Sequence, residues 1–165
     1  MIRKCEDDDI PVMLEIINDA ARAFQGVIPG DCWSEPYMPR DELLAEIEDG
    51  VEFWGHEEAG QLIGIMGIQG VGEVTLIRHA YVRTSRRNRG VGSRLLKELR
   101  RMASGPILMG TWIDAVWAIA FYEKHGFRRL TGAQSARLLR RYWKISDRQV
   151  KNSVVLAERG WREPD

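Results

Sequence analysis

The stretch YVRTSRRNRGVGSRLL, residues 81–96, decides how the rest of the chain is interpreted. Its last fourteen positions hold five arginines and two glycines. The residues that lead into it, from Glu73 onwards, form a strand-like run. After Gly90, apolar residues recur at helical spacing as far as Met102. The stretch therefore predicts a strand, a glycine turn and a helix in direct succession.

Such a turn directs several backbone N–H groups to one spot, where the helix dipole adds positive charge. Gly90 and Gly92 lack the side chains that would keep a phosphate away, and nearby arginines strengthen anion binding: Arg86, Arg87 and Arg89. The chemistry suits a pyrophosphate. A P-loop is excluded because no Gly-Lys-Ser/Thr is present, and Leu95 stands where a Rossmann fingerprint needs its last glycine. A solvated basic turn remains the alternative.

Composition predicts a single domain over residues 1–165 that is cytoplasmic and reduced. The chain has 24 basic and 24 acidic residues, so the molecule as a whole is not a binder of polyanions. Cys5 and Cys32 form no C-x-x-C, which gives little support to a metal site or a disulfide. The N-terminus lacks the apolar region of a secretory signal, and no apolar run reaches membrane-spanning length.

The remaining pattern predicts an alternation of strands and helices. We expect strands at 2–5, 51–58, 61–69, 73–84, 107–112, 127–131 and 152–158. We expect helices at 10–24, 41–50, 90–102, 115–125 and 135–143, with Asp114 as the N-cap of the fourth. The strands between 51 and 84 form an antiparallel meander. This order predicts an α/β (α+β) fold with a mixed sheet flanked by helices.

Two motifs in order resemble those of the GNAT N-acetyltransferase superfamily. The first is R-x-x-G-x-G at residues 87–92, which follows a strand ending in Ala80-Tyr81-Val82. The second is AIAFYEKHGF at 118–127, and the tail YWKISDRQVKNSVVL resembles an uncharacterised bacterial subgroup. The resemblance implies a GNAT-like, largely antiparallel central sheet with helices on both faces. It also implies acetyl-CoA as co-substrate, without a metal.

The resemblance assigns the cofactor site to the strand end and the turn that follows it. The backbone of the strand end would pair with the pantetheine arm, and the amides of the turn would hold the pyrophosphate. The cofactor-binding candidates are Ala80, Tyr81, Val82, Arg87, Asn88, Arg89, Gly90, Val91, Gly92 and Ser93. Relatives often carry an asparagine one turn before the second motif, where this chain has Ala115. That departure weakens the expectation of cofactor contacts from this helix.

Tyr122 is the candidate that protonates the departing thiolate, since the family often keeps a tyrosine there and a phenol of pKa about 10 can donate its proton. Core packing is the alternative role. The backbone N–H of Tyr81 or Val82 is a candidate oxyanion donor. Where some relatives use a strand glutamate as base, this chain offers His79, which can accept a proton or serve only as a sheet-surface residue. Glu73 lies at the strand start and is a more distant carboxylate.

We expect the acceptor pocket to form from the 25–40 loop and neighbouring strands. Its candidate residues are Trp33, Tyr37, Arg78 and Trp112, with Trp54 as a further wall. An aromatic pocket with an acidic group suits a cation, whereas an arginine suits an amino acid, and the sequence does not choose. The expected acceptor is a primary amine of a small molecule, such as an amino acid, amine or antibiotic-like compound. A protein or peptide amine is the alternative, and a homodimer is left open.

Two other function classes compete with an enzyme. A nucleic-acid binder would use two basic clusters, Arg83, Arg86, Arg87, Arg89 and Arg137, Arg140, Arg141, Lys144. The zero net charge and the lack of a nucleic-acid-binding signature argue against it and against a membrane partner. A non-catalytic acyl-CoA-binding protein is the second alternative, because a fold alone does not confer activity.

Overall fold

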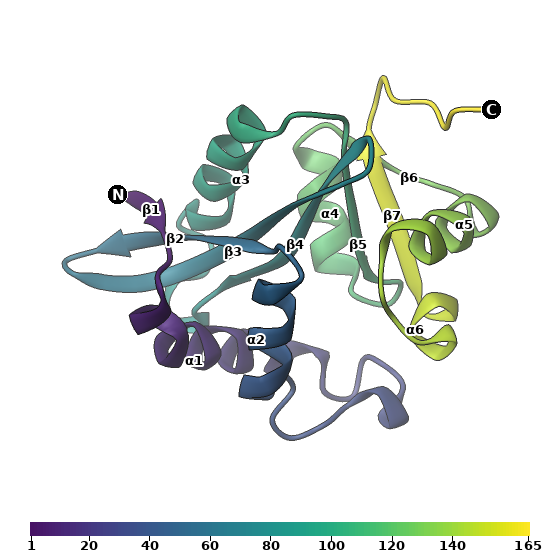
Figure 1. The fold of residues 1–165 in the computed structure, drawn as a ribbon. Coiled ribbons are helices and arrows are strands. Elements are labelled where there is room, and N and C mark those ends of the chain that lie inside the picture. Colours follow the sequence, from purple (N-terminus) through teal and green to yellow (C-terminus); the bar gives the residue numbers. More distant parts are fainter.

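The computed structural model, which describes residues 1–165, is built around a seven-stranded sheet (Figure 1). Its strands are β1 (Ile2–Lys4), β2 (Glu52–Glu58), β3 (Gln61–Val71), β4 (Val74–Val82), β5 (Ile107–Trp112), β6 (Phe127–Arg129) and β7 (Ser153–Glu158). Its helices are α1 (Ile10–Ala21), α2 (Arg40–Glu48), α3 (Val91–Met102), α4 (Val116–Lys124), α5 (Gly132–Tyr142) and α6 (Asp147–Lys151). None of these helices has the length and apolar composition needed to cross a membrane.

The strand order is β1-β2-β3-β4-β5-β7-β6, and every neighbouring pair is antiparallel except β4 and β5. Helices α3 and α4 cover one face, while α1, α2, α5 and α6 cover the other (Figure 1). The prediction of a mixed, largely antiparallel sheet with helices on both faces is confirmed, as is the meander β2-β3-β4.

Three apolar clusters hold these layers together. The largest lies between the sheet and the α3–α4 layer, around Leu95, Leu99 and Ile119. On the other face, α1 and α2 pack on β2 and β3, and α5 packs on β5 and β7. Leu95 and Leu99 are fully buried. Burial of each such side chain stabilises the folded state by roughly 1.5–3 kcal/mol. The opposite face thus carries two separate groups of helices, α1 with α2 and α5 with α6.

Two local predictions were wrong or incomplete. Asp114 is not the N-cap of α4: the helix is capped by Ala115 without a side-chain bond. The reason is a tight turn, in which the Val116 N–H donates to the Asp114 carbonyl at 2.9 Å, so the chain is still turning at that residue. Helix α6 was not predicted, because its five residues are too few for an apolar period to emerge.

The strands β4 and β5 diverge, and this opens the middle of the sheet. They pair only from Thr75 to Ile77, and β4 then continues to Val82 without a partner on that side. A β-bulge lies in the unpaired part, where Met66 of β3 stands opposite two residues of β4. One of them, His79, has a left-handed backbone with φ of 53°. A β-bulge changes the direction in which a side chain leaves the strand. Here the bulge changes the direction of the His79 side chain, beside the gap between β4 and β5.

Candidate active site

The start of α3 presents a row of unsatisfied N–H groups. The Arg87 N–H still bonds within the preceding turn, to the Thr84 carbonyl, and the Arg94 N–H bonds to the Gly90 carbonyl at 3.0 Å. Between them, the N–H groups of residues 88–93 donate to no group of the protein, and no side chain caps the helix. Gly90 allows this geometry because its φ is +76°, which disfavours residues with a side chain. The result is a concave set of donors at a helix N-terminus, which favours an anion.

The arginines around this turn divide into two groups. Arg83 contacts Glu15 and the Leu62 carbonyl, and Arg86 pairs with Glu58 at 3.1 Å. Arg87 and Arg89 form no ion pair or side-chain hydrogen bond, so their charge is free for a ligand. The field at the turn is therefore positive even though the whole chain is neutral.

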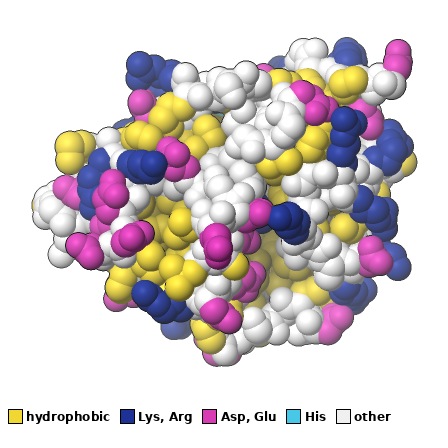
Figure 2. Space-filling view, viewed as in Figure 1, with side chains coloured by type: hydrophobic (Ala, Val, Ile, Leu, Met, Phe, Trp, Pro, Cys, Tyr) yellow, Lys and Arg dark blue, Asp and Glu magenta, His cyan; other side chains and the backbone are white.

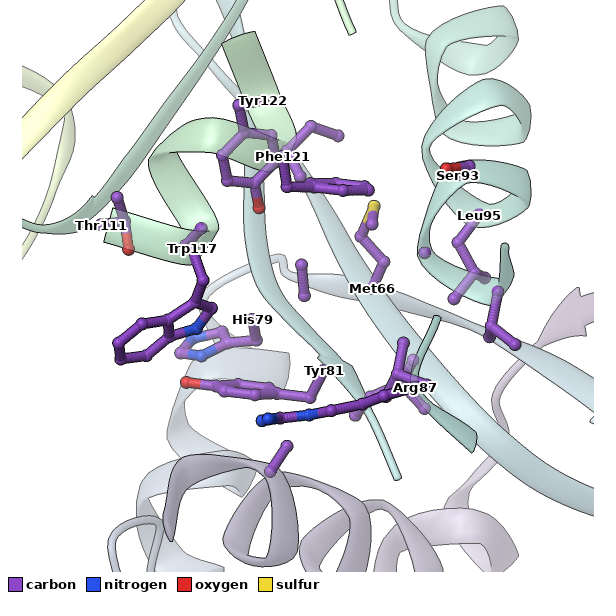
Figure 3. A pocket seen from close by; sticks show the side chains of 18 of the residues that line it. Met66, His79, Tyr81, Arg87, Ser93, Leu95, Thr111, Trp117, Phe121 and Tyr122 are labelled. Carbon is purple, nitrogen blue, oxygen red and sulfur yellow. The ribbon is translucent and has the colours of Figure 1, made fainter. Parts of the chain in front are cut away.

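A cavity of about 630 Å³ extends from this turn into the gap between β4 and β5 (Figure 3). Nine of the ten cofactor-binding candidates line it, Arg89 being the exception. Its other walls come from α1, from Gly110 and Thr111 of β5, and from α4. Gly92 faces α4 closely, since a Cβ added there would lie 3.3 Å from the Phe121 ring. The structure thus brings the two predicted motifs to opposite sides of one cavity.

Tyr122 projects from α4 into this cavity. Its ring packs edge-on against Phe121 and Phe127, with centroid distances of 5.2 and 6.2 Å. The hydroxyl has no hydrogen-bond partner in the protein and points towards the side on which His79 and Tyr81 lie (Figure 3). Burial raises the pKa of the Tyr122 phenol well above 10, so the group keeps its proton at neutral pH. Both the core packing and the access to the cavity that the sequence allowed are therefore present.

Ala115, which stands where relatives often have an asparagine, is fully buried. It packs with Ala21, Phe24 and Trp112 in a small apolar cluster beside the 25–39 segment. A polar amide at this place would be buried among apolar side chains, which is costly without a partner. The departure from the family pattern therefore has a packing reason.

His79 is held by a residue that the sequence analysis did not single out. Its Nε2 is hydrogen-bonded to Oε2 of Glu46 from α2, and the other carboxylate oxygen of Glu46 accepts from Arg78 at 3.3 Å. The Arg78 guanidinium also donates to the Gln69 side chain at 3.4 Å. All three side chains of the Glu46–Arg78–His79 cluster are at most 17% exposed. Burial raises the pKa of Glu46, but the hydrogen bond from His79 and the positive charge of Arg78 help to hold that pKa below its usual value.

A second, smaller hollow lies on the other side of the same gap. We call it the recess; its volume is about 110 Å³, and three of the four acceptor candidates line it: Tyr37, Arg78 and Trp112. Figure 2 shows an apolar floor between α2 on one side and α5 and α6 on the other. Residues after α5 complete its wall: Trp143, Ile145 and Gln149. His79 and Tyr81 line both the cavity and the recess, so the two meet where β4 and β5 part.

Two other aromatic candidates lie outside the recess. Trp33 lines neither hollow but stacks on Tyr37 with ring centroids 5.7 Å apart. Tyr37 in turn accepts a hydrogen bond from Trp112 Nε1 at 2.9 Å, which fixes the 25–39 segment over the end of β5. Trp54 lines neither hollow and donates to Glu52 on the surface.

Glu73, the more distant carboxylate, and a further titratable residue, His125, lie elsewhere. Glu73 accepts hydrogen bonds from Tyr142 and Arg141 at the start of β4, away from the gap. His125 ends α4 and contacts Ser93 Oγ at 2.9 Å, so it touches the anion-binding turn from behind. No group of three or more His, Cys, Asp or Glu side chains is arranged to hold a metal ion.

Comparison with known proteins agrees with this geometry. A family model described as an acetyltransferase (GNAT) domain matches residues 49–129, which contain the turn, the bulge and α4. The PaiA N-acetyltransferase from Thermoplasma acidophilum, solved in complex with coenzyme A, is similar with a TM-score of 0.72 at 17% identity, covering 96% of this chain and 97% of that one.

Two other solved structures share the fold at low sequence identity. A ribosomal-protein-alanine N-acetyltransferase from Brucella melitensis has a TM-score of 0.67 at 19% identity, covering 96% and 98% of the two chains. An N-acetylglutamate synthase from Neisseria gonorrhoeae, complexed with coenzyme A and N-acetyl-glutamate, has a TM-score of 0.65 at 20% identity, covering 98% of this chain and 35% of that one. The chain thus carries an acetyltransferase (GNAT) domain over residues 49–129, with the two motifs on one cavity, and it shares its fold with solved N-acetyltransferases.

Proposed function

We propose that the chain moves an acetyl group from acetyl-CoA directly to a primary amine of a small molecule, within a ternary complex. The observation that carries this proposal is the meeting of the cavity and the recess at His79 and Tyr81, where β4 and β5 part. Two ligands entering from opposite sides would meet there, between these residues of β4 and Gly110 and Thr111 of β5, which also line both hollows. One sheet runs from β1 to β7, which supports a single catalytic domain over residues 1–165.

The residues at the cavity mouth fit coenzyme A. The free N–H groups of residues 88–93 and the unpaired guanidinium groups of Arg87 and Arg89 suit a diphosphate. The side of β4 that lacks a strand partner after Ile77 leaves backbone groups available for an extended, amide-containing chain. When bound, acetyl-CoA would supply a reactive thioester, whose sulfur needs a proton as its bond to the acetyl carbon breaks.

Tyr122 would donate that proton from its hydroxyl. The hydroxyl has no competing partner in the protein, and its raised pKa ensures that the proton is present over the whole neutral range. His79 would accept the proton that an ammonium must lose before its nitrogen can attack. Because the Glu46 carboxylate accepts a hydrogen bond from His79 Nε2, the neutral ring carries its hydrogen there and leaves Nδ1 as the acceptor. Glu46 is thus a positioning residue for the base.

The small size of the recess supports a small acceptor. The 25–39 segment contributes Tyr37 to its wall and is tied to α6 by Arg148, which donates to both carboxylate oxygens of Asp31 at 2.9 and 3.2 Å. A volume of about 110 Å³ suits a compact amine better than a folded protein surface.

A protein N-terminus is the second candidate acceptor, because an apolar patch lies beside the cavity mouth. Ile113, Val116 and Trp117 at the start of α4 are 46%, 67% and 40% exposed, and Trp117 also lines the cavity. Such a patch is a possible contact for an unfolded peptide.

The test is release of free thiol from acetyl-CoA in the presence of small primary amines and of short peptides with free N-termini. We expect turnover that depends on a small amine, with a mass increase of the amine by one acetyl group. Binding of acetyl-CoA without turnover on any amine or peptide would contradict the proposal and favour a non-catalytic acyl-CoA-binding protein. Turnover on peptides but on no small amine would identify a protein N-terminus as the acceptor.

A further inference from the structure

The charges around the recess are not balanced. Arg78 is the one arginine or lysine that lines the recess, and it already has an acidic partner, as do two basic side chains close to the lining, Lys144 and Arg148. Arg78 pairs with Glu46 at 3.3 Å, Lys144 with Asp49 at 2.5 Å, and Arg148 with Asp31 at 2.9 Å. No arginine or lysine that lines the recess therefore has a free charge with which to hold an anionic group.

One carboxylate beside the recess lacks a partner. Glu42 lies four residues before Glu46 on α2, so the two occupy the same face of the helix. The Glu42 carboxylate takes part in no ion pair or hydrogen bond, whereas Glu46 is bound by Arg78 and His79. Glu42 is exposed as a residue, but partial burial of its carboxyl group and the negative charge of Glu46 raise its pKa above the usual value. Figure 2 shows acidic side chains along the edge of the recess that α2 forms.

The walls that face this acidic edge are aromatic. Tyr37, Trp112 and Trp143 line the recess, and Tyr81 separates it from the cavity. Aromatic faces attract cations and pack well against apolar groups. The recess therefore combines an apolar floor with one uncompensated negative charge close to His79.

We propose that the acceptor is a primary amine with an apolar or aromatic body and no carboxylate, bound with its ammonium group towards Glu42 and Glu46 and its body on the aromatic walls. This inference rests on the proposed function and names the substrate class of the same site. An amino acid would have to place its carboxylate against Arg78, whose charge Glu46 already compensates, and would also meet the negative charge of Glu42. Of the two options that the sequence leaves open, the arrangement of charges favours the cation.

The test compares three probes that share one body: phenethylamine, L-phenylalanine and L-phenylalanine amide. Each is titrated by calorimetry into the full chain saturated with coenzyme A, so that no turnover occurs. We expect phenethylamine and the amide to bind at least about tenfold more tightly than L-phenylalanine. Binding of L-phenylalanine as tight as that of phenethylamine, or tighter, would overturn the inference, and so would a lack of binding by all three probes. Spermidine, a polyamine with several positive charges and no aromatic body, is a further probe, and tighter binding of spermidine than of phenethylamine would also overturn it.

A pair of variants identifies the carboxylate responsible. Glu42→Gln removes the charge with almost no change of shape, and we expect the preference for phenethylamine over L-phenylalanine to fall by about threefold or more. Glu48→Gln is the matched control, since Glu48 is exposed on the other side of α2 and has no ion pair. An equal effect of both variants, or none from Glu42→Gln, would show that the preference does not arise at this edge.

Failure of this inference is distinguishable from failure of the proposed function. If L-phenylalanine is acetylated faster than phenethylamine, the enzyme stands and the acceptor class is wrong. If phenethylamine binds preferentially but is never acetylated, the acceptor class stands and the proposed transfer is wrong.

Discussion

The cavity and the recess meet where β4 and β5 part but are built in different ways. The mouth of the cavity comes from one continuous stretch, residues 86–95, and its chemistry resides mainly in backbone N–H groups. The recess is assembled from the 25–39 segment, the end of β5 and the chain between α5 and α6, with α2 at its edge, and its chemistry resides in side chains. A site made of local backbone leaves a spaced glycine pattern in the sequence. A site made of distant side chains leaves none.

The largest effect is expected at the cavity mouth. Gly92→Leu places a side chain where even a Cβ would lie 3.3 Å from Phe121, so it should fill the space in front of the free N–H groups. We expect affinity for acetyl-CoA to fall by about 100-fold, or about 2.7 kcal/mol, in a calorimetric titration. Gly132→Leu is the control, because that glycine has open space around it at the start of α5. Unchanged affinity in Gly92→Leu would break the assignment of the cavity to the cofactor.

Tyr122→Phe separates chemistry from binding within the same cavity. The lost hydroxyl has no partner in the protein, so folding and acetyl-CoA affinity should be unchanged, while kcat should fall by about 100-fold if the phenol is the proton donor. The control is Tyr142→Phe, whose hydroxyl donates to Glu73 away from the gap and should leave kcat unchanged. Similar kcat values for Tyr122→Phe and the native chain would remove Tyr122 from the acid role.

Glu46→Gln tests the recess side of the comparison. Loss of the carboxylate that orients His79 should lower kcat/KM for the amine by about tenfold, with little change in affinity for acetyl-CoA. If acetyl-CoA affinity falls as much as kcat/KM, Glu46 also affects cofactor binding, and the cavity and the recess do not act as separate binding sites.

The same variant has a pH signature. Because the Glu46 pKa is held below its usual value, the ionised carboxylate stabilises the fold above the pKa of the unfolded chain, and this stability is lost as the pH falls through the folded pKa. Chemical denaturation should show the difference between the native chain and Glu46→Gln to be largest near pH 7 and to shrink towards pH 3. A difference that is constant with pH would show that the carboxylate does not act through its charge.

The smallest effect is expected at the contact between the 25–39 segment and α6. Asp31→Asn weakens the contact that ties the 25–39 segment to α6, and since exposed ion pairs contribute little, we expect only about a threefold rise in KM for the amine. Affinity for acetyl-CoA should not change. Glu163→Gln, which weakens the bidentate contact with Arg137 elsewhere on the surface, is the control and should leave both values unaltered. Equal changes in KM for the two variants would show that the Asp31–Arg148 contact has no specific effect on binding of the amine.

Much of the fold was predictable because its elements carry strong local patterns. The strand, turn and helix around Gly90 and the meander before it follow from apolar periods and turn residues, and the structure confirms them. The start of α5 was placed three residues too late, because its capping box of Thr131 and Gln134 has no apolar residue to mark it. Such boundaries depend on side-chain hydrogen bonds that a hydrophobic pattern does not reveal.

The acceptor side was predictable only in part. Tyr37, Arg78 and Trp112 do line the recess, but Trp33 contributes through Tyr37 rather than directly. Glu46 could not be found from sequence, since its contact with His79 spans 33 positions and depends on a β-bulge that turns His79. The four-residue spacing of Glu42 and Glu46 on α2 was the available signal, but it is also typical of an ordinary solvated helix face.

We infer above all that free amides at the start of α3 hold the diphosphate of coenzyme A. Nuclear magnetic resonance of the labelled chain during an acetyl-CoA titration observes these amides one by one, with the amides of Gly132 and Ala133 at the start of α5 as internal reference. We predict large shifts and slowed hydrogen exchange for the amides of residues 88–93, and little change at the reference amides. If saturation with acetyl-CoA leaves the amides of residues 88–93 unshifted, these amides do not hold the diphosphate.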